Sequence, residues 1–243
     1  MKLKNLILFV GLYIFSSCTP TVYYQYFKVK PDSNIAVESN CLIYQDENCS
    51  VIYNLWDSQG NIGFEFHNKT NQEIYINKEK TFYILNGIAY NYFQDRTYTK
   101  INKADYYGNF PGGYSSVTLK EDRLICIPSG KSKIINEYKV TNKLYEDCDY
   151  KLYPLVSEIK SQNFSATNSP IVFSNIISYK VGENGIEKLF ENKFYVSEIT
   201  NYPGTQVEGY DYKQCNLKIY KLYLKNSSPD KFYLKYNLYQ QVY

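Results

Sequence analysis

Residues 62–90, IGFEFHNKTNQEIYINKEKTFYILNGIAY, carry the signals that decide the fold of this 243-residue chain. In IGFEFH the apolar residues fall at every second position, so that Phe64 and Phe66 share one face, as in a β-strand with one buried side. The polar stretch NKTNQ has the composition of a turn, after which EIYIN resumes the alternation with Ile74 and Ile76. Short alternating segments separated by turns predict an antiparallel β structure.

The same stretch ends in a tight reversal, FYILNGIAY, at residues 82–90. Asn86 and Gly87 tolerate positive φ, which a two-residue type I′ turn requires at both of its central positions. The turn places Tyr83 opposite Tyr90 and leaves both faces of the strand pair largely apolar. Such a pair is expected in the centre of a β-sandwich, where both of its faces are covered.

Further strand signals follow along the chain. They fall at residues 51–56, 123–138, 171–181, 192–203, 216–224 and 231–239, the last two flanking the turn NSSPD. One spacing is helical instead, and it is formed by Leu152, Leu155, Val156 and Ile159. We therefore expect a mainly β protein, an immunoglobulin-like antiparallel β-sandwich with long loops and at most one short helix, built as a single domain over residues 35–243.

The amino terminus has the pattern of an export signal. A basic start, MKLKN, precedes ten apolar residues, LILFVGLYIF, and then SSC. Ten residues in a helix span about 15 Å, too little for a bilayer core of about 30 Å. The run Phe15-Ser16-Ser17-Cys18 resembles the lipobox of bacterial lipoproteins. This resemblance implies removal of residues 1–17, a diacylglycerol thioether on Cys18, and residues 18–34 as a lipidated tether. The alternative is an ordinary signal peptide with an incidental cysteine.

Composition limits the classes of partner. The formal net charge is +3 with only two arginines, which gives no electrostatic footprint for nucleic acid. The chain also lacks the polybasic cluster of a protein held on a membrane by electrostatics. Tyrosine is abundant, with 29 residues against 13 Phe. This fits strands with half-buried rings, and a surface of exposed rings that binds sugar is the alternative.

The strand pattern fades between residues 94 and 116, QDRTYTKINKADYYGNFPGGYSS. We expect a long polar and aromatic loop there, and long loops in compact domains are often functional. A surface excursion without a role is the alternative. If the loop binds carbohydrate, the rings that would contact it are Tyr98, Tyr106, Tyr107, Phe110 and Tyr114.

Sequence motifs for catalysis and metal binding are weak. His67 is the only histidine and is expected to face solvent at a strand end, and no known catalytic or phosphate-binding motif occurs. The acidic run EDCD at residues 146–149 is expected to be a solvated turn rather than a calcium site. We therefore expect no enzyme activity and no cofactor. A carboxylate-dependent hydrolase stays open as a minor alternative, with these candidates: Asp95, Asp105, Glu121, Asp122, Glu146, Asp147 and Asp149.

Five cysteines besides Cys18 leave at least one thiol unpaired within the chain. They are Cys41, Cys49, Cys126, Cys148 and Cys215. A Cys41–Cys49 bridge is disfavoured, because a hairpin over CLIYQDENCSVIY would separate the two by about 10 Å, beyond the reach of a disulfide. The sequence does not decide whether Cys126 pairs with Cys148.

Three segments together, residues 60–92, CIPSGKSK and NKFYVSEITNYP, resemble uncharacterised lipoproteins of the Bacteroides group. This resemblance implies a β-sandwich lipoprotein and transfers no catalytic residue. The stretch CTPTVYY lacks acidic residues after the anchor cysteine, which favours the periplasmic face of the outer membrane over the cell surface. We expect a non-catalytic binding or structural module, anchored through Cys18, with an envelope protein or a glycan as partner. A carbohydrate-binding surface lipoprotein is the alternative.

Overall fold

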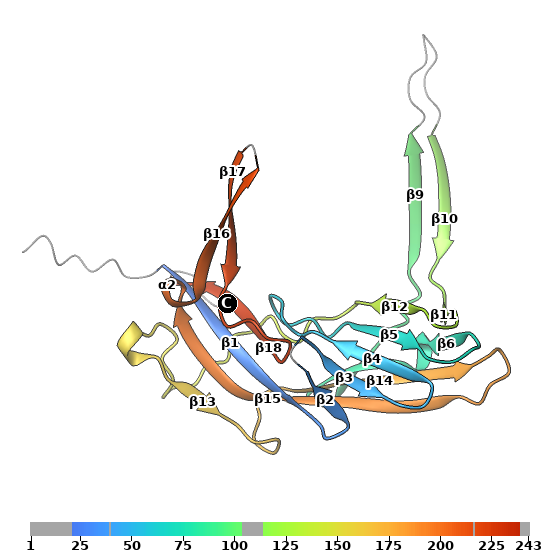
Figure 1. Ribbon diagram of the computed structural model, residues 1–243, viewed down its shortest axis with the longest axis horizontal. Helices are drawn as coiled ribbons and strands as arrows, with labels where there is room; N and C mark the ends of the chain where they lie inside the picture. The colour runs from blue at the N-terminus through green and yellow to red at the C-terminus, as the bar shows by residue number, and fades with distance from the viewer. Residues whose placement is uncertain (1–20, 39, 104–113, 216, 239–243) are drawn as a thin grey trace, which may run out of the picture.

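The computed structural model describes residues 21–38, 40–103, 114–215 and 217–238. Within them the protein is mainly β, with curled antiparallel sheets that form a sandwich-like body and two hairpins that project from it (Figure 1). The mainly β, sandwich-like fold predicted from the sequence is thus confirmed. No helix among these residues is both long and apolar enough to cross a membrane.

Strands are the dominant elements, and only short helical turns interrupt them. The strands are β1 (Val22–Pro31), β2 (Ile35–Val37), β3 (Leu42–Gln45), β4 (Cys49–Tyr53), β5 (Phe64–Asn68), β6 (Ile74–Asn77), β7 (Phe82–Leu85), β8 (Ile88–Asn91), β9 (Thr97–Lys103), β10 (Tyr114–Lys120), β11 (Leu124–Ile127), β12 (Ser132–Ile135), β13 (Ser161–Asn163), β14 (Val172–Val181), β15 (Lys188–Pro203), β16 (Glu208–Cys215), β17 (Leu217–Leu224) and β18 (Lys231–Asn237). The helical turns are η2 (Lys78–Lys80), η3 (Val156–Glu158) and α2 (Gly204–Val207).

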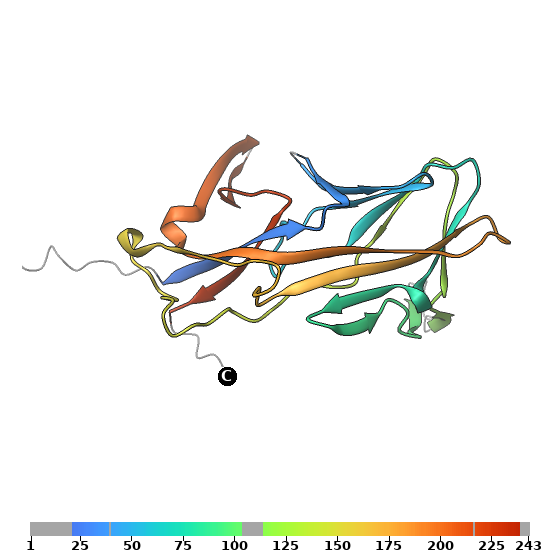
Figure 2. The ribbon, with the colours of Figure 1, turned by 90° about the horizontal axis from the view of Figure 1, so that it is seen from below.

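Two sheets enclose the main core. The larger has the order β11-β6-β14-β15-β1-β18, with β7, β8 and β13 at its sides, and the smaller has the order β12-β5-β4-β3-β2. Strands β14 and β15 run along the length of the body (Figure 2). Rings from opposite sheets meet between them: the centroid of Phe66 is 5.6 Å from that of Tyr179, and the centroid of Tyr53 is 5.2 Å from that of Phe194. All four side chains are buried, so this layer is the hydrophobic core.

The alternation read in residues 62–76 is confirmed, since Phe64, Phe66, Ile74 and Ile76 are all buried. Their two strands nevertheless lie in different sheets, with β5 in the smaller and β6 in the larger. The turn between them crosses from one sheet to the other and is held by Asn68. The amide nitrogen of this side chain donates to the carbonyl oxygens of Gln72 at 2.7 Å and Ile127 at 3.0 Å. Strands β11 and β12 are divided between the sheets in the same way.

The Asn86-Gly87 turn is confirmed, but the position expected for its strands is only half right. The φ angles are 47° and 84°, and Tyr83 pairs with Tyr90 in the predicted register. Strand β7 pairs with β14, whereas β8 pairs only with β7 and all four of its residues are exposed. The hairpin therefore lies at a side of the sheet. Strand β7 is joined to the sheet through β14, and the outer edge of β8 has no partner among the described strands.

The stretch expected as a tether, residues 18–34, is largely part of the sandwich. Strand β1 begins at Val22 and lies between β15 and β18. Most of its rings pack inside, and Phe27 is fully buried. The buried amide of Gln25 is satisfied by the side chain of Asn201 and by the backbone of Tyr145, which removes the cost of burying it.

Two other expectations are corrected. The loop predicted from residue 94 is instead the hairpin β9–β10, with residues 104–113 outside the described part of the chain. The predicted helix shrinks to the turn η3, since Leu155 is extended and both Leu155 and Val156 are exposed and have no core to face. The two strands that flank the NSSPD turn have different partners, since β17 pairs with β16 and β18 pairs with β1.

Candidate interaction site on a projecting hairpin

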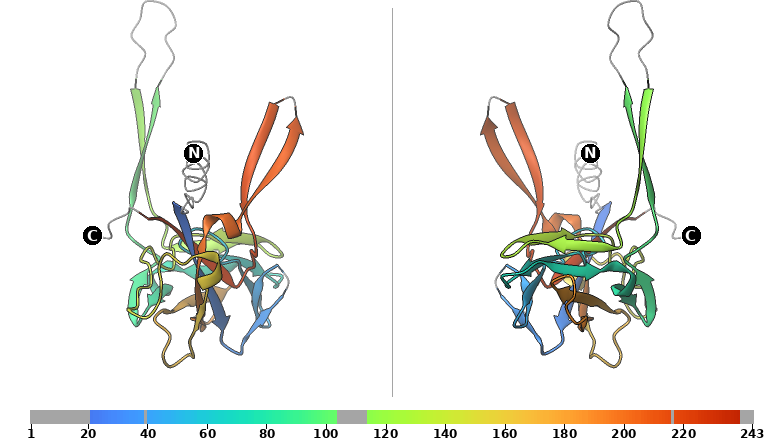
Figure 3. Two further views of the ribbon diagram at one scale, coloured as in Figure 1. Left: turned by 90° about the vertical axis from the view of Figure 1, so that its left-hand side faces the viewer. Right: turned by 90° about the vertical axis from the view of Figure 1, so that its right-hand side faces the viewer.

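Strands β9 and β10 leave the body as a two-stranded ribbon, and β16 and β17 form a second ribbon on the same side (Figures 1 and 3). The β9–β10 register runs from Thr97 opposite Lys120 to Lys103 opposite Tyr114. An isolated two-stranded ribbon is marginally stable in water. Its direction must therefore be held by contacts at its base or by a partner.

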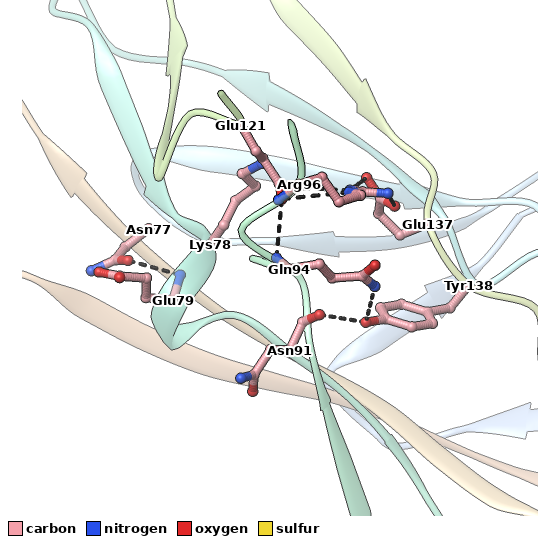
Figure 4. A network of polar contacts seen from close by, with 9 residues as sticks. All are labelled: Asn77, Lys78, Glu79, Asn91, Gln94, Arg96, Glu121, Glu137 and Tyr138. Atoms are coloured by element: carbon pink, nitrogen blue, oxygen red, sulfur yellow. Dashed lines mark hydrogen bonds and ion pairs between the residues drawn. The ribbon is translucent and has the colours of Figure 1, made fainter. Parts of the chain in front are cut away.

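The base of the β9–β10 ribbon is an ionic cluster (Figure 4). Arg96 precedes β9 and Glu121 follows β10, and the Glu121 amide donates to the Arg96 carbonyl at 2.8 Å. The Glu121 side chain is only 3% exposed. Its Oε1 atom accepts from Lys78 Nζ at 2.5 Å and from Arg96 Nη2 at 3.0 Å. A buried carboxylate is thus paired with two cations from two different elements.

The cluster extends from the ribbon into the body. Arg96 also binds both carboxylate oxygens of Glu137, at 2.9 and 2.8 Å, in a bidentate pair. The second oxygen of Glu121 accepts the backbone amides of Gln94 and Arg96, each at 3.1 Å. Two cations and two carboxylates balance each other, and these bonds fix the direction in which the ribbon leaves the sandwich.

The pKa of Glu121 reports the same balance. Burial by itself raises the pKa of the carboxyl, but the hydrogen bonds from Arg96 and Lys78 outweigh it and lower the pKa to about 2. The carboxylate charge is therefore kept at all physiological pH values. The sequence makes Glu121 a candidate hydrolase residue. In the structure both of its carboxylate oxygens accept hydrogen bonds at the base of the ribbon, so this side chain holds the ribbon in place.

One face of the ribbon is apolar. Residues directly opposite one another on paired strands point to the same face, so Tyr98 lies beside Leu119, and Lys100 beside Val117. We call Tyr98, Val117 and Leu119 the apolar ribbon face, which Lys100 borders. Tyr98, Leu119 and Val117 are 50%, 57% and 48% exposed, respectively.

The sequence-predicted site residues are placed as follows. Tyr98 lies on β9 and Tyr114 begins β10, whereas Tyr106, Tyr107 and Phe110 lie outside the described residues, as does Cys18. Sequence reasoning missed Val117 and Leu119, and it missed the grouping of Arg96 with Glu121. The period-two pattern in YSSVTLK was the signal available for the first two. Nothing local indicates the ionic cluster.

The second ribbon is held at its base by tyrosines of β1. The Tyr24 hydroxyl donates to Glu208 Oε1 at 2.8 Å, and the Tyr26 hydroxyl donates to the Lys225 carbonyl at 3.1 Å. Tyr210 is 64% exposed and lies opposite Leu222, which is 42% exposed. Both ribbons therefore present apolar side chains to solvent.

The structure also gives the hydrogen-bond partners of two other candidates from the sequence, His67 and Asp147. His67 Nδ1 lies 3.1 Å from Ser132 Oγ on the neighbouring strand. Asp147 accepts from the Tyr145 hydroxyl at 3.1 Å and from the Asp149 amide at 3.0 Å, so it organises its own turn. Among the residues described, no three His, Cys, Asp or Glu side chains are grouped as a metal site.

Four of the cysteines carry free thiols in the structure. They are Cys41, Cys49, Cys126 and Cys148. The hairpin joining β3 and β4 pairs Tyr44 with Val51, whereas the predicted separation of the two cysteines assumed that Tyr44 pairs with Cys49. The lack of a Cys41–Cys49 bridge agrees with the prediction, although the register on which it was argued is shifted.

No protein-family model matches the chain, and neither a curated protein nor a solved structure matches it significantly. The likeness to lipoproteins of the Bacteroides group stays a prediction from the leader and the strand motifs.

Proposed function

We propose that this protein is a lipid-anchored, non-catalytic binding module of the bacterial cell envelope, which engages a partner protein through the apolar ribbon face. The observation that carries this proposal is the exposure of Tyr98, Val117 and Leu119 on a ribbon whose base is rigidly held. An exposed ribbon with apolar side chains gains stability when a partner covers it. A held base lowers the entropy lost on binding.

The charge of the ribbon favours an acidic partner surface. The two strands carry three lysines, Lys100, Lys103 and Lys120, and no carboxylate. Complementary charge speeds encounter and suppresses wrong partners. We therefore expect the partner to present apolar side chains bordered by Asp or Glu.

The anchor supports an envelope location. Because β1 begins at Val22, four residues beyond the lipobox cysteine Cys18, the first residue of the sandwich would lie within about 14 Å of the lipidated residue. Such a short connection keeps the sandwich close to the bilayer. The absence of acidic residues after the cysteine in CTPTVYY favours the periplasmic face of the outer membrane.

Site-specific photo-crosslinking in intact cells tests the partner surface. A crosslinking amino acid at Val117 or Leu119 should capture one discrete envelope protein. The matched controls are Thr99 and Thr118, which pair with each other on the opposite face of the same ribbon. Capture at 117 and 119 but not at 99 and 118 supports the proposal. Equal capture from both faces, or none from either, refutes it.

Carbohydrate binding by the tyrosines of this hairpin is a second candidate function. The half-exposed Tyr98 ring favours it, since the Arg96 guanidinium lies 5.9 Å from the ring centroid and orients it. A glycan array tests this function. We expect a Tyr106→Ala plus Tyr107→Ala variant, and separately Tyr98→Ala, to lose the signal. An unaltered signal in both would remove this candidate.

A further inference from the structure

A groove of about 680 Å³ lies between the β7–β8 hairpin and residues 138–145, away from the apolar ribbon face. Its volume is typical of small-molecule sites. Buried Tyr83, Val140 and Ile171 form its deeper part, and Tyr90, Asn142 and Lys143 are exposed side chains in its lining. None of the sequence motifs pointed to this combination, because its residues come from distant parts of the chain.

Three tyrosine rings form one end of the groove in a fixed arrangement. The centroid of Tyr83 lies 5.9 Å from that of Tyr90 and 5.2 Å from that of Tyr138, with both pairs stacked. The Tyr83 hydroxyl donates to the Val140 carbonyl. The Tyr138 hydroxyl accepts from the Gln94 amide at 3.0 Å and donates to the Asn91 carbonyl (Figure 4). Tyr90 is 40% exposed, so a supported ring remains open to a ligand.

Uncommitted amide groups also line the groove. In the described part of the chain, the side-chain amides of Gln59 and Asn142 make no hydrogen bond, and both residues are exposed. The Asn86 amide, by contrast, is occupied by the backbone of Pro170 and Val172. A free amide offers one acceptor and two donors, which suits a ligand rich in hydroxyl groups.

The charge of the lining is positive. Lys139 and Lys143 line the groove, and no described lining residue is Asp or Glu. Lys139 is paired with Asp57. Lys143 makes no ion pair with any described residue and is exposed, so it can meet a negative group on a ligand.

We propose that this groove binds a short acidic oligosaccharide. A sugar ring stacks on Tyr90, its hydroxyl groups bond the amides of Gln59 and Asn142, and its carboxylate pairs with Lys143. An extended peptide that adds a strand to the sheet fits less well. Strand β8 has only four residues, and the Asn91 carbonyl already accepts the Tyr138 hydroxyl.

Isothermal titration with trigalacturonate, with neutral maltotriose as the comparison, tests this site, and an array of uronate, sialylated and sulfated glycans extends the search. We expect an acidic glycan to bind, and Tyr90→Ala and Lys143→Gln each to weaken that binding by about tenfold or more. Tyr210→Ala, on the second ribbon, is the matched control and should bind as the parent does. The Lys143 side chain is exposed, so Lys143→Gln is expected to leave the fold intact. The test therefore stays valid even if Tyr90→Ala loses stability.

Failure to bind any acidic glycan on the array overturns the proposal, as does unchanged affinity in both groove variants. Equal or stronger binding of maltotriose overturns the acidic specificity. None of the altered residues belongs to the apolar ribbon face, so the photo-crosslinks from positions 117 and 119 would stand or fall independently of these results.

Discussion

At the scale of single residues, Gly60 shows how tightly the body is packed. Its φ is +74°, and a Cβ atom there would lie 2.8 Å from Phe232 Cγ and 2.9 Å from Val140 Cγ2. The site therefore excludes other residues on both backbone and packing grounds. Phe232 is fully buried and stacks on Phe27 at 4.5 Å, so its ring has little room to move.

We expect Gly60→Ala to lower the free energy of unfolding by about 3 kcal/mol, combining the left-handed backbone cost with overpacking. The control is Gly130→Ala, where φ is +63° but the space around the Cβ position is empty. It should cost about 1–2 kcal/mol, from the backbone alone. Urea denaturation measures both, and equal losses would contradict the packing explanation.

Glu121 is the residue on which the ribbon base depends. Its removal would leave Lys78, whose side chain is 10% exposed, and Arg96 without their shared carboxylate. We expect Glu121→Ala to cost about 3 kcal/mol, the usual result of breaking a buried pair on one side. The Glu79–Arg123 pair is exposed, so Glu79→Ala should cost less than about 1 kcal/mol. Similar losses in the two variants would show that the cluster contributes little.

The same carboxylate predicts a pH dependence. Its pKa in the folded protein, about 2, lies below its ordinary value of 4.5. A depressed carboxyl pKa stabilises the fold above the unfolded value, and this contribution is lost as the pH falls from about 4.5 towards 2. Denaturation curves of the parent and Glu121→Gln should therefore differ most near neutral pH and converge towards pH 2. A constant difference across this window would contradict the assignment.

At the scale of elements, side-chain alternation identified strands but not their partners. Strands β5 and β6 follow each other in the chain and were recognised from Phe64, Phe66, Ile74 and Ile76, yet they belong to opposite sheets. The period of two depends only on which face is buried. Which strand lies alongside depends on turn geometry, such as the bonds made by the Asn68 amide.

The β9–β10 ribbon shows where the same reasoning fails. The sequence predicts a loop over β9 and the first residues of β10, because polar residues outnumber apolar ones on both strands. A ribbon that leaves the body has no core face, so the hydrophobic signal used to find strands is weak. The surviving signal, Val117 and Leu119 two residues apart, marks the face that we propose binds a partner.

At the scale of the whole molecule, the proposed lipid anchor at Cys18 would set the position of β1, and with it the sandwich, relative to a membrane. We expect Cys18→Ala to release the protein from the membrane fraction and to abolish labelling by a radioactive fatty acid. Cys41→Ala, at a thiol outside the lipobox, should behave like the parent. Continued membrane association of Cys18→Ala would refute lipid anchoring.

Much of this protein was determined by its sequence alone: a β-rich body, the type I′ turn at Asn86-Gly87, and the buried faces of β5 and β6. These features depend on residues a few positions apart in the chain. Their backbone φ preferences and the alternation of polar and apolar side chains can be read locally.

Only the tertiary structure decided the sheet to which each strand belongs, the projection of the ribbons, and the two candidate sites. The ionic cluster joins residues 78, 96, 121 and 137, and the groove joins residues 59, 90 and 142. Such groupings arise when distant segments pack against one another, and no local pattern of polarity records them.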